Sequence, residues 1–458
     1  MSPLIASPES AARPKPGVEV PALPRQIGKY TVKSKLGEGA TSEVFLAHDP
    51  FLGRDVAIKR VRAGLVPGSR ELHYQQRFFA AEAALVGHLQ HPNVVQIFDA
   101  VADEEAPYLV TEVVGGGTLR RFCRPDNLLP LAVIIEIGFK CAMALGYCYQ
   151  RGLIHRDVKP ANLLVVLKGE HVVDVKVTDF GSVFNLGAEH TQVFRVGSLA
   201  YMSPEQLDGD TLDCRADINS LGAVLFHLVA GRPPFDAQQQ QALMQQIYHG
   251  CAPPLSTLRD GVPPALQALI EASLAKEREL RPANWDEVAA ALSALVSKGL
   301  VPRVGLQEVL DSERYTLLRA LEFFAEFGDV ALWEVVRRAT WTRHRYGHAL
   351  FKRGDRGDSF HIITQGEVQV LRDGATVATL GSGASVGEMA YLAPNPELRV
   401  HSVDILVSQP ATTVSFNPQR MQGLSLDTLH AFDKAFIRVL VRRLHAAHEA
   451  LAHPRRIL

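Results

Sequence analysis

The order of strand-like and helix-like segments is the feature that most constrains the fold of this chain. Between Tyr30 and Val66, runs of alternating and β-branched residues are separated by glycine-containing turns, a pattern typical of antiparallel strands. Helical spacing of apolar residues begins near Gln75 and dominates after Leu128, interrupted by one predicted hairpin over 162–177. The sequence therefore predicts an α+β fold in which a strand-rich lobe precedes a mostly helical one.

The pattern changes again near Gly299. Helical spacing continues beyond it, and short strands with glycine turns follow between His348 and Met389, which favours a small β-barrel or jelly roll. The stretch from Leu426 to Ala452 has the spacing of an amphipathic helix. We therefore expect a disordered, proline-rich leader (1–26), a first domain (27–298), a linker helix (299–318) and a second domain with flanking helices (319–452).

Composition narrows the class of protein. The 458 residues are 47% hydrophobic, and 48 Lys+Arg balance 49 Asp+Glu, so no basic excess favours a nucleic-acid partner. No apolar run is long enough for a membrane span, and the first residues lack the pattern of a secretory signal. The five cysteines form no CxxC pair, which fits a reducing compartment. We expect a cytoplasmic protein without a membrane partner.

A glycine-rich segment lies between the first two strand patterns. Residues 36–44 read Leu-Gly-Glu-Gly-Ala-Thr-Ser-Glu-Val, and such a turn can present backbone N–H groups to phosphate oxygens. Alone it is more often a simple hairpin turn. Fifteen residues after Val44, Lys59 stands in an apolar strand, where an unpaired ammonium would be costly. Its candidate anionic partners are Glu82, on the next helix pattern, and phosphates.

Polar motifs flank the predicted hairpin. Residues 155–162 read His-Arg-Asp-Val-Lys-Pro-Ala-Asn, and Asp179 opens an Asp-Phe-Gly motif seventeen residues after Asn162. Phosphoryl transfer needs a group that orients the acceptor hydroxyl, oxygen ligands for a metal, and cations for the phosphate charge. Asp157 suits the first role, Asn162 and Asp179 can hold Mg²⁺ (or Mn²⁺), and Lys59 and Lys159 can neutralise phosphate oxygens.

Over about residues 28–298, this ordered set of motifs resembles the eukaryotic-like, bacterial-type protein Ser/Thr kinase family. The resemblance implies a bilobal kinase fold and transfer of the ATP γ-phosphate to Ser/Thr hydroxyls of proteins, including autophosphorylation. Lys159, two residues after Asp157, is the Ser/Thr-kinase form of the loop. The alternative is a pseudokinase that binds ATP without catalysis, and the presence of Lys59, Asp157, Asn162 and Asp179 argues against it.

The same resemblance implies the site residues. Glu112 and Val114 would read the adenine edge from a hinge, and Gly115–Gly117 would be the hinge exit rather than a second phosphate loop. Ser42 replaces the third glycine of the family's loop, so the loop is less free to close. The implied catalytic residues are Asp157, Lys59, Glu82 and Lys159; the implied ATP-binding residues are Leu36, Gly37, Glu38, Gly39, Ala40, Thr41, Ser42, Val44, Ala57, Lys59, Glu112, Val114 and Leu164.

Further family features concern structure and control. Glu205 would form a structural ion pair with Arg281, and Asp217 would brace the catalytic loop. Arg156 is a cation that a phosphorylated activation loop could satisfy. The candidate phosphorylation sites are Thr191 first, then Ser182 and Ser198. A permanently ordered loop is the alternative.

The C-terminal segment has its own signature of glycine turns, followed by Gly387-Glu388 and then Arg399. It resembles the cyclic-nucleotide-binding domain. The resemblance implies that backbone N–H groups at Gly387 face a cyclic phosphate, Glu388 bonds the ribose, and Arg399 neutralises the phosphate. Cyclic AMP or cyclic GMP would then be the effector, and movement of the final helix would raise kinase activity by relieving inhibition.

The neighbours of Arg399 depart from that family's pattern. Leu398, Val400 and His401 stand where a proline and small residues are usual, and Val400 and His401 could crowd the phosphate. The alternative is a degenerate docking or dimerising module, through which an oligomer could form. In the simplest version of that alternative, the glycines are only hairpin turns and Arg399 is a surface charge.

Overall fold

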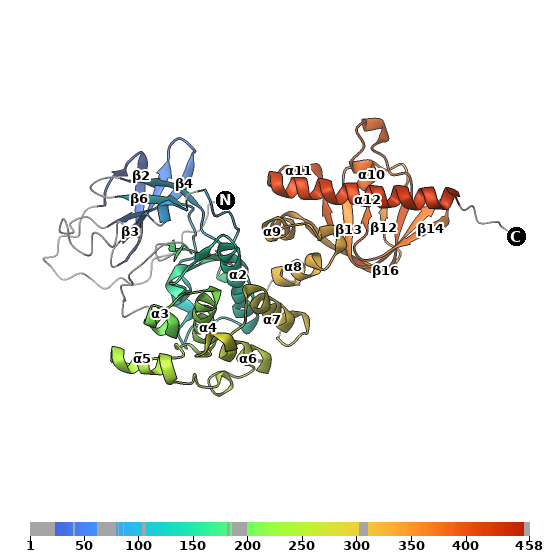
Figure 1. The fold of residues 1–458 in the computed structure, drawn as a ribbon. Coiled ribbons are helices and arrows are strands. Elements are labelled where there is room, and N and C mark those ends of the chain that lie inside the picture. Colours follow the sequence, from blue (N-terminus) through green and yellow to red (C-terminus); the bar gives the residue numbers. More distant parts are fainter. Residues whose placement is uncertain are drawn as a thin grey trace. The chain divides into compact units, whose positions relative to one another are not determined.

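The fold comes from a computed structural model that describes residues 23–39, 42–61, 79–80, 82–85, 87–102, 107–180, 184–185, 199–301 and 310–452. The chain forms two compact units. The smaller comprises residues 1–87 and 97–113, and the larger comprises 88–96 and 114–458. Figure 1 shows their helices and strands, and each unit is described by itself.

The smaller unit is built on a six-stranded antiparallel sheet with the order β1-β2-β3-β4-β6-β5. Its core is formed by inward-facing apolar residues such as Tyr30, Phe45, Ile58 and Val110, all almost fully buried. The predicted strand-rich lobe is therefore confirmed. The strands are β1 (Gln26–Ile27), β2 (Tyr30–Glu38), β3 (Ser42–Asp49), β4 (Arg54–Val61), β5 (Ile97–Val101) and β6 (Tyr108–Thr111).

The first part of the larger unit is mostly helical. Helix α2 (Leu131–Tyr149) packs against α4 (Cys214–Ala230) and α7 (Trp285–Ser297). The predicted hairpin forms as β8 (Leu163–Lys168) and β9 (His171–Val177). The remaining elements of this part are β7 (Leu153–Ile154), β10 (Phe184–Asn185), α3 (Pro204–Asp208), α5 (Gln240–His249) and α6 (Pro264–Ser273).

Helix α2 is buried almost all round, which the sequence analysis did not single out. Within the described residues, it is the one helix whose length and apolar composition would allow a membrane crossing, yet 83% of the apolar window is buried inside the protein. It also carries Glu136 and Lys140, both buried. A helix enclosed by protein on all sides in this way serves as the core helix of its domain.

The last part of the larger unit is a second sheet with flanking helices. Its main strand order is β11-β16-β13-β14, with β12 on β16 and β15 on β13. The predicted small β domain is confirmed, and the predicted final helix is α12. The elements are α8 (Asp311–Arg319), α9 (Asp329–Arg338), β11 (Thr340–His344), β12 (Ala349–Phe351), β13 (Phe360–Arg372), β14 (Ala375–Leu380), β15 (Ser385–Val386), α10 (Glu388–Tyr391), β16 (Asp404–Phe416), α11 (Pro418–Met421) and α12 (Leu426–Ala452).

A cluster of phenylalanines joins the helices of this part to its sheet. Phe432 and Phe436 on α12 contact Phe360 on β13, at ring-centroid distances of 5.8 and 4.9 Å. Phe323 also contacts both α12 rings. Beyond this cluster, α12 exposes apolar residues, among them Val441 and Leu444. The first half of α12 is therefore fixed in the core, and the second half is more exposed.

Two predicted segments fall largely outside the described residues. Of the predicted leader (1–26), residues 1–22 lie outside the described part, and of the predicted linker helix (299–318), residues 302–309 do. At the end of the predicted linker, α8 begins at Asp311. The four domain boundaries given above remain predictions.

Candidate functional site

The smaller unit holds the predicted lysine–glutamate pair. Lys59 lies on β4, opposite Val44 on β3. Its Nζ atom donates to both carboxylate oxygens of Glu82, at 3.0 and 2.8 Å. Glu82 is almost fully buried, so the pair compensates the cost of placing either charge there. The structure brings the two residues together as the strand and helix patterns predicted.

The glycine-rich segment is the connection between β2 and β3. The N–H of Gly39 donates to the carbonyl of Ser42 at 2.7 Å, which closes the turn. Gly37 pairs with Val44 across the two strands, and Ala57 is buried in β4. Leu36 is exposed, and Lys35 pairs with Glu38 at 2.8 Å. Two predicted ATP-binding residues, Ala40 and Thr41, lie outside the described residues.

The predicted hinge follows β6. Thr111 pairs with Ala57 on β4. Glu112 belongs to the smaller unit and Val114 to the larger one, so their joint contact with an adenine stays a prediction. A Cβ on Gly116 would lie 2.0 Å from the carbonyl oxygen of Val165. That close approach to β8 explains a glycine at this position and favours the hinge exit over a second phosphate loop.

In the larger unit, the catalytic-loop residues gather around Asp157. Lys159 donates from Nζ to both carboxylate oxygens of Asp157, at 2.9 and 2.7 Å. Asn162 donates from Nδ2 to the Asp157 carboxylate at 3.0 Å and to its backbone carbonyl at 2.9 Å. The carboxylate is thus held in one orientation before any substrate binds.

The side chain of Asp217 on α4 holds the backbone of this loop. Its buried carboxylate accepts the backbone N–H groups of His155 and Arg156, at 2.7 and 2.8 Å. Burial raises the pKa of Asp217, and the contacts with the two loop residues oppose that rise. Arg156 has a φ of +66°, a conformation that non-glycine residues adopt only when their surroundings hold them. Asp217 supplies that restraint.

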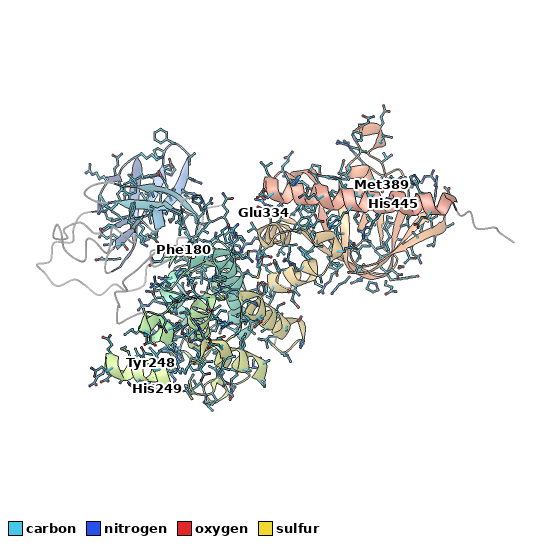
Figure 2. All side chains as sticks on the ribbon, viewed as in Figure 1. Phe180, Tyr248, His249, Glu334, Met389 and His445 are labelled. Carbon is cyan, nitrogen blue, oxygen red and sulfur yellow. The ribbon has the colours of Figure 1, made fainter. Side chains whose placement is uncertain are left out.

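Asp179 lies two residues after the end of β9 and also has a left-handed backbone, with a φ of +67°. The preceding N–H, of Thr178, donates to the carbonyl of Asn162 at 3.0 Å, so the backbone next to Asp179 is bonded to that of Asn162. His155 is buried, contacts the Phe180 ring at 4.9 Å and hydrogen-bonds the Thr178 carbonyl; Phe180 is labelled in Figure 2. His155 is therefore a core histidine, as expected.

The donor set at this point fits a hard divalent cation. Both Asn162 Nδ2 hydrogen bonds go to Asp157, so the amide oxygen of Asn162 could serve as a metal ligand together with the Asp179 carboxylate. Mg²⁺ is commonly held by one or two protein oxygens together with phosphates and water. In the described part of the chain, no group of three or more His, Cys, Asp or Glu forms a metal site, and the expected pair does not require one.

Glu205 and Arg281 form the expected structural ion pair. The two N–O distances are 2.5 and 3.0 Å, and both side chains are buried. The other hydrogen bonds of Arg281 go to backbone carbonyls, so the pair is fully engaged in the domain core. The candidate phosphorylation sites Ser182, Thr191 and Ser198 lie outside the described residues.

In the second domain, Gly387 precedes α10 with a φ of +83°. A Cβ there would lie 2.9 Å from both the Phe351 ring and the Ser359 carbonyl, so the position requires glycine. Glu388 is 1% exposed and accepts a hydrogen bond from Arg443 on α12. Arg443 also donates to the Ser385 carbonyl at 2.7 Å. Figure 2 labels the residues beside Glu388 and Arg443, Met389 on α10 and His445 on α12.

The Glu388 site is polar and incompletely bonded. Within the described residues, Glu388 Oε2 and Ser385 Oγ are buried without a hydrogen-bond partner. Buried polar atoms normally have partners, and an exception calls for an explanation such as a missing ligand. Sequence reasoning identified Glu388 but missed Ser385 and Arg443, because neither belongs to the short motif around Gly387.

Arg399 is exposed and donates from Nε to the Ala393 carbonyl at 3.0 Å. Its neighbours differ in placement: Leu398 and Val400 are exposed, whereas His401 is buried and stacks on Phe351 at 4.0 Å. The His401 side chain is therefore committed to the core through Phe351.

The strand-borne Lys59–Glu82 pair and the Asp157–Lys159–Asn162 cluster ahead of a hairpin are the parts that the protein kinase class uses. Residues 30–293, which are 264 of the 458 residues, match the protein kinase domain family. The chain belongs to the protein kinase family. Residues 342–425 match the cyclic nucleotide-binding domain, so a kinase domain is followed by a cyclic-nucleotide-binding domain.

Several curated relatives of this chain are bacterial kinases. Serine/threonine-protein kinase PknB of Mycobacterium leprae is 36% identical over 303 residues, which cover 64% of this chain and 47% of the relative. A probable serine/threonine-protein kinase of Streptomyces coelicolor is 34% identical over 280 residues, covering 59% and 40%. One of Clostridium acetobutylicum is 32% identical over 270 residues, covering 58% and 39%. The chain thus spans about half or less of the length of these relatives.

Proposed function

We propose that this protein is an ATP-dependent protein serine/threonine kinase. The observation that carries the proposal is the Asp157 carboxylate, held by Lys159 and Asn162 next to the backbone that presents Asp179. The Lys59–Glu82 pair and the sequence relatives support it.

In the proposed reaction, the substrate hydroxyl oxygen attacks the γ-phosphorus of ATP and the bond to the bridging oxygen of ADP breaks. Asp157 orients the hydroxyl and accepts its proton. Lys159, 2.7 Å from Asp157, neutralises charge on the transferred group. Lys59 positions the phosphates while Glu82 holds its ammonium in place. A divalent cation, Mg²⁺ or Mn²⁺, held by Asn162 and Asp179, would supply charge neutralisation at the phosphates.

The decisive experiment follows transfer of labelled γ-phosphate from ATP to a generic protein substrate and to the chain itself. Asp157→Asn keeps the size of the side chain and one of the two bonds from Lys159 but removes the proton acceptor. We expect loss of transfer in this variant and full activity in the matched control Asp260→Asn, whose side chain is exposed. If the wild-type protein binds ATP without transferring phosphate, the pseudokinase alternative replaces the proposal.

We further propose control by autophosphorylation of Thr191, with Ser182 and Ser198 as secondary sites. Arg156 is held in place by Asp217, and a phosphate on the activation segment would supply an anion for it. Thr191→Ala should lower activity, whereas wild-type kinetics for a verified dephosphorylated enzyme would support a permanently ordered segment instead.

We propose that the second domain binds cyclic AMP or cyclic GMP. The unfilled oxygens of Glu388 and Ser385 support a hydroxyl-bearing ligand, and the glycine at 387 allows close approach of a phosphate to the backbone. Arg399 would neutralise the phosphate. Because Arg443 bonds Oε1 of Glu388, a ribose hydroxyl that donates to the unpaired Oε2 would share this carboxylate with α12 and change the contact between Glu388 and Arg443. That change would couple the ligand to kinase activity, which we expect to rise.

Calorimetric titration of the full chain with each cyclic nucleotide tests the sensor. Binding of either one, with a change in phosphorylation rate, supports it. If neither gives heat at millimolar concentration, the domain is a docking or dimerising module, and the kinase proposal is unaffected. The cytoplasmic location and an oligomer formed through this domain remain predictions.

A further inference from the structure

A buried cluster of charges within the larger unit centres on Lys140 of α2. This side chain is 2% exposed. Its Nζ atom lies 3.5 Å from Glu136, 3.3 Å from Asp174 and 2.9 Å from Asp311. Burial by itself would lower the pKa of Lys140, but the three carboxylates raise it above its usual value. The lysine is therefore charged, and the three carboxylates around it come from three different elements of the chain.

Those elements come from the kinase domain and from the segment that follows it. Glu136 and Asp174 lie on α2 and β9 of the kinase domain, whereas Asp311 is the first residue of α8. Ser312, the next residue on α8, donates from Oγ to Glu136 at 2.6 Å. All of them belong to the same compact unit. Helix α8 therefore supplies one of the three carboxylates around Lys140 and a hydroxyl donor to Glu136.

Aromatic packing reinforces the same contact. Phe139 on α2 lies 5.9 Å from the ring of Tyr315 on α8 and 6.0 Å from that of Trp333 on α9. Tyr315 and Trp333 contact each other at 5.3 Å, and Trp333 is completely buried. Together these rings bury a large apolar area. Helices α8 and α9 thus share a hydrophobic core with α2 and are not a loose linker.

Arg337 extends the contact from α9 to the hairpin that precedes Asp179. It donates to Asp174 on β9 at 2.7 Å and lies 3.5 Å from Oδ1 of Asn93. Asn93 in turn donates from Nδ2 to Asp174 and to the Val175 carbonyl, both at 2.7 Å. Its own carbonyl accepts the N–H of Val177 at 2.8 Å. Arg337 and Asn93 therefore hold β9 through side-chain and backbone bonds.

The charge of Asp174 follows from its surroundings. Burial alone would raise the pKa of Asp174, but Lys140 and Arg337 hold it below the usual range. Asp174 is therefore an anion shared by a kinase-domain lysine and an α9 arginine. Beyond it, β9 ends at Val177, two residues before Asp179.

Helix α9 is also bonded to the start of α12. Glu334 accepts hydrogen bonds from the backbone N–H and the hydroxyl of Ser425, at 2.9 and 3.0 Å. Ser425 immediately precedes α12. Helix α9 thus contacts the β8–β9 hairpin through Arg337. Through Glu334 it also contacts the start of α12, the helix that bears Arg443.

We propose that α8 and α9 form an intramolecular docking surface for the kinase domain, in which Arg337 is a positioning residue for the reaction. By holding Asp174 and Asn93, Arg337 fixes β9 and through it the backbone that presents Asp179. This role rests on the proposed kinase function but not on cyclic-nucleotide binding.

The test uses the full chain without cyclic nucleotide and compares Arg337→Met with Arg345→Met, since Arg345 is an exposed arginine of the same domain. Arg337→Met should raise the half-saturating Mg²⁺ concentration by about twofold to thirtyfold, the range of coupling effects at a distance. The KM for the protein substrate should stay the same. Arg337→Lys, which keeps the charge but loses the planar fork, should lie between wild type and Arg337→Met.

A double-mutant cycle with Asp174→Asn separates positioning from general destabilisation. If the two residues act together, the double variant should need little more Mg²⁺ than the worse single variant. A lower thermal midpoint with a wild-type Mg²⁺ curve would show that Arg337 is merely structural. If Arg337→Met does not fold, the Arg337→Lys curve decides.

An activity-independent measurement keeps this inference distinct from the proposed function. Amide hydrogen exchange at Val175 and Val177 should quicken in Arg337→Met and remain as in wild type in Arg345→Met. Unchanged exchange would overturn the inference even in an active kinase. Faster exchange in a chain that transfers no phosphate would support the docking contact and remove only the kinase proposal.

Discussion

The catalytic loop and the Glu388 site differ in what their key carboxylates bond. Asp157 is held by two residues of its own motif, Lys159 and Asn162. Glu388 is held by Arg443, which is 55 residues away along the chain. At the catalytic loop, residues close by in the sequence hold the carboxylate. At the Glu388 site, an arginine of α12, distant in the sequence, holds it. A ligand can therefore join the first arrangement directly, whereas at the second it has to share the Glu388 carboxylate with the protein's own cation.

The largest effect should come from a change in the catalytic site of the kinase domain. Lys59→Met keeps the apolar stem and removes the cation that bonds Glu82. We expect phosphate transfer to fall by at least about a hundredfold, as for loss of one preorganised electrostatic group. Initial rates of transfer measure it. Lys33→Met is the control, because Lys33 pairs with Asp55 at the surface. Near-wild-type rates for Lys59→Met would contradict the assignment.

On the sensor side, Arg399→Ala should weaken cyclic-nucleotide binding by about tenfold or more. A charge-assisted hydrogen bond is worth about 1.5–3 kcal/mol. Titration calorimetry measures the dissociation constant, and basal kinase activity serves as the internal control because it should persist. Unaltered affinity would show that Arg399 is only a surface charge.

Arg443→Ala sharpens the comparison because its expected direction is opposite. If Arg443 competes with the ligand for Glu388, its removal should tighten nucleotide binding by about threefold to tenfold, part of the value of a charged hydrogen bond. Arg442→Ala is the matched control, since Arg442 pairs with Glu322 at the surface. Weaker binding in Arg443→Ala would mean that Arg443 contacts the ligand rather than competing with it.

The smallest effect concerns acid stability of the sensor domain. Burial, with smaller contributions from His344 and His401, lowers the pKa of His361 to about 4. Below about pH 6.5, the unfolded chain binds a proton that folded His361 does not, so stability falls as the pH decreases towards about 4. The slope from this group is at most about 1.4 kcal/mol per pH unit.

Urea unfolding between pH 7 and pH 4.5, followed on the transition of the second domain, measures this slope. His361→Gln should lose less stability on acidification than wild type. His445→Gln, at an exposed position of α12, should behave as wild type. Equal slopes for all three proteins would assign the acid sensitivity to other groups.

Sequence patterns predicted the features that depend on residues close together along the chain. Strand alternation and motif spacing located Lys59, Asp157, Asn162, Asp179 and Gly387, because their neighbours in sequence determine the turns and strands that present them. The α+β fold, the β8–β9 hairpin and the bounds of α12 were predicted for the same reason.

Contacts between distant segments could not be predicted in this way. Lys140 reads as one polar residue in an apolar helix, and only folding brings Asp174 and Asp311 to it. The partner of Glu388 depends on how α12 packs, which no local pattern reports. Gly116 likewise looks like part of a flexible run, although its position is determined by the close approach of Val165.

The phenylalanine cluster gives α12 the mechanics of a lever. Phe432 and Phe436 anchor it against Phe360, and Arg443 lies seven residues beyond the second anchor, about 10 Å further along the helix axis. Over that length, a tilt of about ten degrees at these rings would displace the helix at Arg443 by roughly 2 Å, enough to break or make its bond with Glu388. The anchoring rings lie in the domain core, so the second half of α12 can move while the packing of the core is kept.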